Sequence, residues 1–190
     1  MLFTSFPFLI FIFCFFSIYF LISKKNKNLL LLISSLFFYG WWDYRFLFLL
    51  VFSIVFDFFL GNLIDESKDI KKRKKFLYIS VFLNLAVLCI FKYLDFFAQS
   101  LASIFEKINI NFFNDLTFNI ILPIGISFYT FQKLSYIFDL YNKKCKVEKD
   151  FITFASYVSL FPQLIAGPIL RAHKLLPQLK KNIYPKIIDG

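Results

Sequence analysis

The 190-residue chain is 59% hydrophobic, contains 31 phenylalanines and has a formal net charge of +10. A soluble core of this size cannot bury so much apolar surface, so the composition excludes an ordinary soluble domain and indicates an integral membrane protein. The positive charge would suit nucleic acid, but the lysines lie in breaks between apolar stretches, where basic residues hold loops in the cytoplasm and contact anionic lipid headgroups. We therefore expect a lipid bilayer as partner and no nucleic acid.

Two apolar stretches open the chain. Residues 1–23 carry no charge, and about 20 apolar residues in helical form match the ~30 Å hydrocarbon layer of a bilayer. This run is too long for a signal peptide and its positive charges follow it, so a retained span is predicted. Lys24 and Lys25 place its far end in the cytoplasm and Met1 outside. Residues 28–42 then return outward and end in aromatic residues suited to the headgroup region.

A third span over residues 46–64 and a fourth over 76–93 flank the most basic segment, residues 71–75, which is expected in the cytoplasm. Apolar residues then recur at helical spacing over residues 95–108, opposite a polar face. Residues 95–118 are accordingly predicted to form a helix and loop on the outer surface, with Asn111 outside.

A fifth helix is predicted to start near Pro123, because the missing N–H of proline falls where a first helical turn has no partner for it. It runs inward to about Tyr141 and leads into a cytoplasmic loop around Lys146. The sixth apolar stretch, residues 151–170, is interrupted by Pro162, and a full crossing would leave the basic tail outside. A re-entrant or kinked segment resolves both conflicts.

These elements predict an all-α integral membrane protein. Residues 1–190 form a single membrane domain, a multispan helical bundle with about five crossing helices and the re-entrant segment 151–170. The chain is expected in the inner (cytoplasmic) membrane as a multi-pass protein.

Polar residues inside the predicted spans are the candidates for function, since a charge at mid-membrane costs roughly 2.5–3.5 kcal/mol on insertion scales. For Asp57 two interpretations stay open: an interior position with partners on other spans, or a position near a helix end. Gln132 is expected to hydrogen-bond another helix, Lys133 raises the same question, and Asp139 is expected at the interface. No catalytic constellation and no metal-ligand spacing is present, and no bound cofactor is predicted.

His173 and Cys145 are two side chains that could be chemically reactive. His173 is the one histidine in the sequence, and it lies in a basic stretch where we expect water and no carboxylate partner, so it is not expected to be a tuned base. Cys145 lies between Lys144 and Lys146, which leaves open a thiolate that is readily acylated or oxidised, or an ordinary exposed loop thiol.

Two stretches, LPIGISFYTFQKLSYIFDLY (122–141) and FPQLIAGPILR (161–171), resemble signature regions of the membrane-bound O-acyltransferase superfamily, most closely its alginate O-acetyltransferase-like branch. Upstream, LLISSLFFYGWWDYRFLFLL, SIVFDFFLGN and FKYLDFF look like the amino-terminal half of that branch. The resemblance covers nearly the whole chain, with its motifs in the family's order.

The resemblance implies the amino-terminal part of an enzyme that moves an acetyl group from a cytoplasmic donor such as acetyl-CoA across the membrane toward an exported polysaccharide, alginate-like or peptidoglycan. The remaining carboxy-terminal half and a separate extracytoplasmic acyltransferase are the implied partners. Because the family's catalytic histidine lies beyond the point matching Gly190, no catalytic residue is carried over and this chain alone is expected to be inactive.

In the family, the region resembling residues 161–171 dips into the membrane near the acyl-transfer tunnel. Gln163, Gly167, Pro168 and Arg171 are therefore candidates for the cytoplasmic side of the tunnel wall. Three alternatives stay open: a D-alanyl donor, as in the sister branch; a small multispan transporter with Asp57 and Gln132 in its pathway; and a non-catalytic membrane scaffold.

Overall fold

The computed structural model describes residues 4–106, 120–167 and 170–181, and within these ranges it contains helices and no strand. Their bounds are α1 (Phe6–Leu21), η1 (Lys24–Asn26), α2 (Lys27–Gly40), α3 (Tyr44–Glu66), α4 (Ile70–Glu106), α5 (Ile126–Tyr141), α6 (Phe151–Ser159), α7 (Phe161–Ala166) and α8 (Ala172–Lys181). Only α3 and α4 are long and apolar enough to cross a membrane among the described helices. The all-helical prediction is confirmed for this part of the chain, and five crossings stay a prediction.

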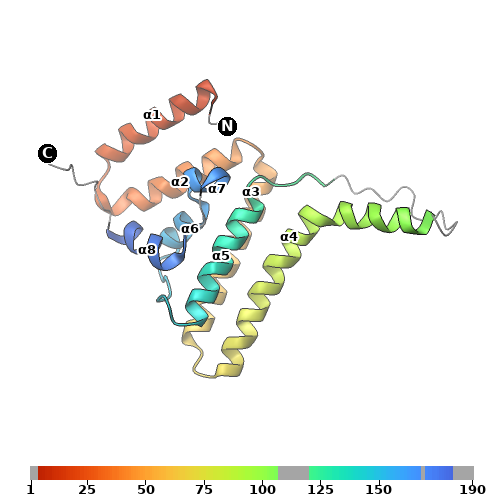
Figure 1. Cartoon of the computed structure of the whole chain (residues 1–190). Helices are drawn as coiled ribbons and strands as arrows, with labels where there is room; N and C mark the ends of the chain where they lie inside the picture. Colours follow the sequence, from red (N-terminus) through yellow and green to blue (C-terminus); the bar gives the residue numbers. More distant parts are fainter. Residues whose placement is uncertain (1–3, 107–119, 168–169, 182–190) are drawn as a thin grey trace, which may run out of the picture.

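The centre of the fold is a bundle of α3, α5 and the first part of α4, which lie side by side in Figure 1. A Cβ added at Gly61 on α3 would lie only 3.1 Å from Cε1 of Tyr136 on α5. The missing side chain therefore lets these two helices approach closely. Ile54, Leu88 and Ile137, one from each helix, are buried in the core between them.

The sixth apolar stretch folds as two short helices that meet at Leu160. Pro162 lies in the first turn of α7, the position that tolerates its missing N–H. Helix α6 has 9 residues, a length of about 14 Å, which is half of what a crossing needs. Residues 153–159 are buried all round, against α2, α3, α5 and α8. The predicted break is present, and entry of this segment into the membrane stays a prediction.

Helix α4 differs from the prediction of a span followed by a separate surface helix. It is one uninterrupted helix of 37 residues, because its sequence contains neither glycine nor proline to end it. Its length of about 55 Å exceeds the ~30 Å hydrocarbon layer. Figure 1 shows that α4 bends and that its last part leads away from the bundle. The rest of the predicted surface segment, residues 107–118, lies outside the described residues.

Helix α5 begins at Ile126, three residues after the predicted start at Pro123. Gly125 precedes it with φ +76°, a left-handed conformation that favours glycine. A Cβ there would also lie 2.6 Å from the carbonyl oxygen of Leu164 on α7. The close approach of α7 therefore requires glycine at the position that precedes α5, and the local sequence does not show this contact.

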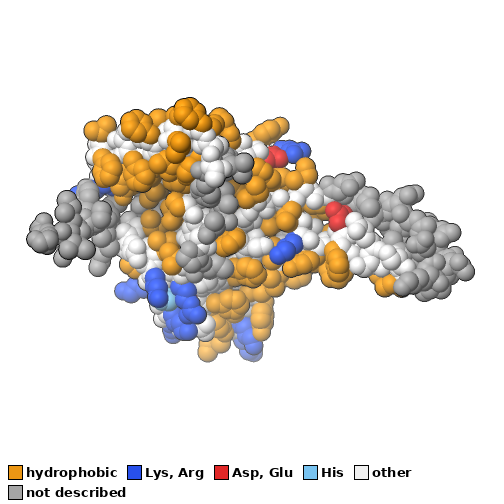
Figure 2. Space-filling model, turned by 45° about the horizontal axis from the view of Figure 1, so that its top comes forward, with side chains coloured by type: hydrophobic (Ala, Val, Ile, Leu, Met, Phe, Trp, Pro, Cys, Tyr) orange, Lys and Arg blue, Asp and Glu red, His pale blue; other side chains and the backbone are white. Residues whose placement is uncertain are grey.

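Helix α1 is held by a small aromatic cluster on an otherwise exposed apolar surface. Phe15 of α1, Phe38 of α2 and Phe161 of α7 are buried together, and the ring centroid of Phe161 lies 5.4 Å from that of Phe15. Phe13 and Phe20 are 75% and 70% exposed, and Figure 2 shows apolar side chains covering this edge of the molecule, with basic side chains near the opposite edge. Apolar exposure on this scale matches a lipid environment.

Two basic loops meet at one end of the bundle. Nη2 of Arg73, in the first turn of α4, donates a hydrogen bond to the carbonyl oxygen of Tyr141 at the end of α5 over 3.1 Å. The loop that follows α5 carries Lys143, Lys144 and Lys146. Both clusters therefore lie at the same end of the bundle, which agrees with the charge rule for loops on one side of a membrane.

We predict that this end is cytoplasmic and that the start of α3 faces outward. In a chain whose own cysteines are replaced by serine, a membrane-impermeant maleimide added to the outer face should label a cysteine at Arg45 and spare cysteines at Lys68 and Lys144. All three should react after permeabilisation, which is the control. Labelling of Lys68→Cys and Lys144→Cys in intact cells would contradict this topology.

Candidate functional site

A buried polar cluster around Asp57 joins the three helices of the bundle. From α4, Ser80 Oγ donates to Asp57 Oδ1 over 2.6 Å and Asn84 Nδ2 donates to Oδ2 over 2.8 Å. From α5, Nζ of Lys133 lies 3.0 Å from Oδ2, and the two charged side chains are 2% and 1% exposed. Of the two interpretations left open for Asp57, the interior position with partners on other helices is correct.

Lys133 is the partner that sequence reasoning did not assign. A lone intramembrane acid calls for a cation on a neighbouring helix, and Lys133 is the lysine in the middle of α5, so the signal was present. Besides Asp57, its ammonium group faces the carbonyl oxygen of Ser53 at 3.5 Å and the ring centroid of Tyr129 at 5.6 Å.

The acceptor sites of the Asp57 carboxylate are all occupied by protein donors. A carboxylate has about four acceptor sites, and Asp57 receives donors from Ser80, from Lys133 and, on both oxygens, from Asn84. No acceptor site is left for the proton of a substrate. The cluster positions α3, α4 and α5 relative to one another.

A cavity of about 260 Å³ lies beside this cluster. Asp57, Asn84 and Lys133 form its polar end, and most of its wall is apolar. The apolar and aromatic lining residues are Leu49, Phe52, Phe56, Leu83, Val87 and Tyr129. Because Asp57, Asn84 and Lys133 are already paired with one another and most of the wall is apolar, the cavity suits a largely apolar occupant.

A second, uncharged polar contact links α5 to α6. Gln132 Nε2 donates to the carbonyl oxygen of Tyr157 over 2.6 Å, and Tyr157 Oη donates to the carbonyl oxygen of Gln132 over 3.2 Å. Both residues are buried. The prediction that Gln132 hydrogen-bonds another helix is confirmed.

Helix α2 supplies hydrogen-bond partners to the interrupted segment that α6 and α7 form. Asn28 Nδ2 donates to Thr153 Oγ1 over 2.9 Å, and Ser156 Oγ donates to the carbonyl oxygen of Asn28 over 2.8 Å. At the break itself, the backbone N–H of Phe161 donates to Ser35 Oγ over 3.2 Å. Protein groups thus satisfy the backbone where the helix is interrupted, the condition under which broken helices are tolerated at membrane depth.

The candidates for the tunnel wall are only partly brought together. Gln163 is buried in α7, and Gly167 ends that helix. A Cβ on Gly167 would lie 2.7 Å from Cα of Gln163, so a side chain there would clash. Arg171 is exposed before α8, and Pro168 lies outside the described residues. A tunnel role for these four stays a prediction.

The expectation that His173 has no carboxylate partner is wrong. His173 Nδ1 lies 3.1 Å from Asp139 Oδ2, and the Asp139 side chain is only 8% exposed, although an interfacial position was expected for it. The amphipathic helix α8 makes this contact, because its apolar residues Leu175 and Leu179 are buried while its polar side chains face outward. A second ion pair also holds α8, because Nζ of Lys180 lies 2.9 Å from Oε2 of the buried Glu148.

No cluster of three histidine, cysteine or acidic side chains that could hold a metal is found among the residues that the structure describes.

Comparison with known proteins finds bacterial O-acetylases and O-acetyltransferases. The probable alginate O-acetylase of Pseudomonas aeruginosa is 40% identical over 187 residues, which is 97% of this chain and 35% of that protein. The probable alginate O-acetylase of Azotobacter vinelandii is 38% identical over 186 residues, 97% of this chain and 37% of that protein. A peptidoglycan O-acetyltransferase of Helicobacter pylori is 32% identical over 191 residues, 85% of this chain and 35% of that protein.

The chain is similar over nearly its whole length to alginate O-acetylases and to a peptidoglycan O-acetyltransferase. It corresponds to their amino-terminal part and spans about a third of the length of the curated relatives it matches. No family model matches the chain, and no solved structure matches it significantly. In this acetylase-like chain the first motif region contains α5 and the second contains α7 and ends just before α8, and the two regions meet at Gly125 and Leu164.

The thiolate interpretation of Cys145 does not hold in the acetylase-like chain. Burial raises the pKa of the Cys145 thiol to about 11, and the nearby carboxylate of Asp139 adds to the shift. The half-buried position of the side chain outweighs the exposed lysines beside it in the sequence. At neutral pH this group is a protonated, unreactive thiol.

We predict that Lys133→Ala lowers the free energy of unfolding by about 3–5 kcal/mol, because it leaves the Asp57 carboxylate buried without a counter-charge. The double variant Asp57→Leu with Lys133→Leu removes both charges. It should lower the free energy of unfolding by less than the sum of the losses from Asp57→Leu and Lys133→Leu made singly. Thermal or denaturant unfolding in detergent measures each variant, with Lys92→Ala, an exposed lysine of α4, as the control. Additive effects would show that the two side chains are not coupled.

We also predict that Cys145 alkylates slowly at neutral pH. The raised pKa means that the thiolate is scarce below pH 11, so the rate with iodoacetamide should rise about tenfold per pH unit and still be rising at pH 10. Cys14 and Cys89 are replaced by serine to leave one thiol. The matched control places the cysteine at exposed Lys143, with Cys145 also replaced, and should react faster at pH 8. A rate for Cys145 that levels off by pH 9 would contradict the prediction.

Proposed function

We propose that this chain forms the amino-terminal helical bundle of a membrane O-acetyltransferase that acetylates an exported cell-envelope polysaccharide. The match to a probable alginate O-acetylase, 40% identical over 187 residues, carries the proposal. The peptidoglycan O-acetyltransferase of Helicobacter pylori supports the same reaction class with a different acceptor. Alginate-like polymers and peptidoglycan are accordingly the two acceptor classes to test.

The remaining parts of the proposal follow the family. The acetyl donor is cytoplasmic, with acetyl-CoA as the expected compound, and the group moves outward across an inner (cytoplasmic) membrane that this multi-pass chain spans. The partners are the carboxy-terminal portion of the enzyme and an extracytoplasmic acyltransferase. The contribution of this chain is to hold α5, α6 and α7 around the path of the acetyl group.

The contacts of the broken segment support this role. Residues 153–159 of α6 and Phe161, Gln163 and Leu164 of α7 are buried, and the interruption between the helices is satisfied by Ser35, with the Gln132–Tyr157 contact beside it. A protein surrounds irregular backbone at membrane depth only where it lines a path or a core. Gln163 and Gly167, at the end of α7, then form the part of the wall that this chain supplies.

The transporter interpretation is less well supported. A residue in a transport pathway needs a free polar face for its cargo. Asp57 has all of its acceptor sites occupied within the bundle, and Gln132 is engaged with Tyr157. Neither candidate for that pathway offers such a face.

We predict that this chain can replace the matching amino-terminal part of the Pseudomonas aeruginosa relative. The chimera should restore acetylation of alginate in cells that lack that protein, measured as ester-linked acetate on the secreted polymer. The 190-residue chain alone, reconstituted with labelled acetyl-CoA and acceptor, should transfer nothing. A chimera that inserts stably at normal abundance but gives no acetate would contradict the proposal.

In the same chimera, His173→Ala should lower acetylation less than tenfold, because His173 is expected to tie α8 to Asp139 and the family places its catalytic histidine elsewhere. Loss of a general base costs about 100-fold to 10,000-fold, so the two outcomes separate clearly. Lys174→Ala, an exposed neighbour on α8, is the control. Transfer by the short chain that His173→Ala abolishes would make His173 the base.

A further inference from the structure

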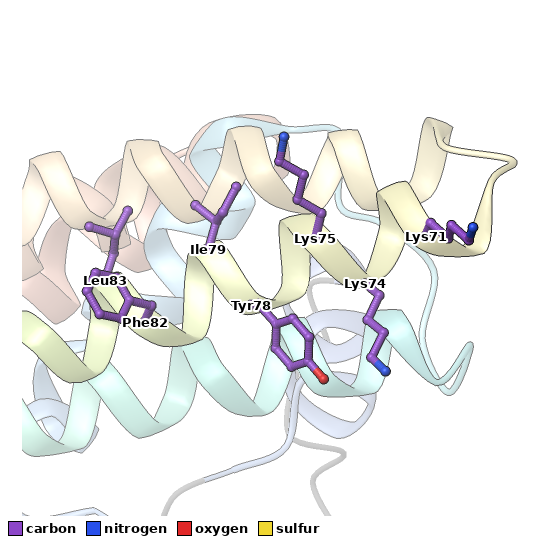
Figure 3. A pocket seen from close by; sticks show the side chains of 7 residues that line it. All are labelled: Lys71, Lys74, Lys75, Tyr78, Ile79, Phe82 and Leu83. Carbon is purple, nitrogen blue, oxygen red and sulfur yellow. The ribbon is translucent and has the colours of Figure 1, made fainter.

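The outward face of α4 carries two rows of side chains that begin with lysine and end with apolar residues. Residues four positions apart lie above one another on a helix, and both rows follow that spacing. The first row is Lys71, Lys75, Ile79 and Leu83, and the second is Lys74, Tyr78 and Phe82. Figure 3 shows Lys75, Ile79 and Leu83 along one edge of the helix and Lys74 and Tyr78 along the other. A groove of about 590 Å³ lies against this face.

The lysine end of the groove is positively charged. Lys71, Lys74 and Lys75 are exposed, and none of them forms an ion pair within the described ranges. The nearby carboxylate of Asp69 is engaged in accepting from the backbone N–H of Lys71. Arg73, in the same basic run, turns away to the carbonyl oxygen of Tyr141. Three exposed lysines within little more than one helical turn therefore carry the positive charge at this end, with Lys75 and Lys74 on opposite edges of the helix in Figure 3.

The rest of the groove is apolar and open. Tyr78 is 58% exposed and Phe82 is 71% exposed. The Tyr78 ring separates the two regions, with its centroid 5.6 Å from Lys74 Nζ. An aromatic ring of this kind sits well between a charged headgroup layer and the hydrocarbon.

The dimensions match one leaflet of a bilayer. Lys75 and Leu83 are eight residues apart, which is about 12 Å along a helix. Half of the hydrocarbon layer is about 15 Å thick. With the lysines at the level of the headgroups, the apolar part of the groove runs along most of one leaflet, and Leu83 brings it to the cavity beside Asp57.

We propose that this groove binds one anionic glycerophospholipid of the cytoplasmic leaflet. Its phosphate lies among the ammonium groups of Lys71, Lys74 and Lys75, and one acyl chain follows Tyr78 and Phe82 toward Leu83. The charge selects an anionic headgroup, and the apolar rows require an attached acyl chain. A second lysine cluster, Lys143, Lys144 and Lys146, has no such rows beside it, since the loop residues Cys145 and Val147 are half-buried.

The experiment measures lipids retained by the purified 190-residue chain in native mass spectrometry. Phosphatidylglycerol and phosphatidylcholine with identical acyl chains are offered in equal amounts. We expect phosphatidylglycerol to be retained at least tenfold better. The triple variant K71Q/K74Q/K75Q should lose about fivefold in retention for each lysine removed, whereas the matched control K143Q/K144Q/K146Q, which loses the same charge, should change retention less than threefold.

A further variant and a competitor test the acyl part of the site. Phe82→Ala should weaken both lipids equally, and its unchanged thermal unfolding would show that the fold is intact, since Phe82 is exposed. Soluble glycerol phosphate should not displace the lipid. Equal losses in the two lysine variants would mean nonspecific attraction, and displacement by glycerol phosphate would mean a bare phosphate site. Either result, or equal retention of the two lipids, overturns the proposal.

Discussion

The ion pair between Asp57 and Lys133 is the constraint on which the rest of the bundle depends. Two charges buried in a membrane protein are stable only when they meet with good geometry and their remaining hydrogen-bonding sites are filled. Ser80 and Asn84 fill those of Asp57 from one side, so the pair fixes α3, α4 and α5 relative to one another. The contact of Arg73 with Tyr141 then joins α4 and α5 at the basic end.

This arrangement explains how an interrupted segment can lie inside the protein. Helices α6 and α7 are too short to satisfy their own ends, and their polar groups find partners on α2 and α5, which the bundle holds in place. The close approach of Gly125 to the carbonyl oxygen of Leu164 fits α7 against the start of α5. The two motif regions shared with the acetylase-like relatives therefore pack together, although a basic loop and α6 separate them in the sequence.

Apolar and basic side chains occupy separate parts of the surface, as expected for a protein in a bilayer. Phenylalanines of α1 and of the α4 groove are exposed where lipid would cover them, and lysines gather where these surfaces end. The buried charges and the exposed lysines of the α4 groove have different surroundings: the first position helices, and the second lie on the surface.

The sequence by itself determined the class of the protein, its apolar helices, the basic breaks, the interruption near Pro162 and the family. All of these depend on residues close together along the chain: hydropathy, charge placement, proline and short motifs. It also indicated that Gln132 must bond another helix, because a lone amide at mid-membrane needs a partner.

Only the tertiary structure decided which residues meet. It paired Asp57 with Lys133 and Asp139 with His173, moved the start of α5 to Ile126, and raised the pKa of Cys145 through burial. Each of these outcomes depends on side chains that helix packing brings together from distant positions. A local pattern shows that a buried charge needs a partner, but the partner's identity follows from which helix faces touch.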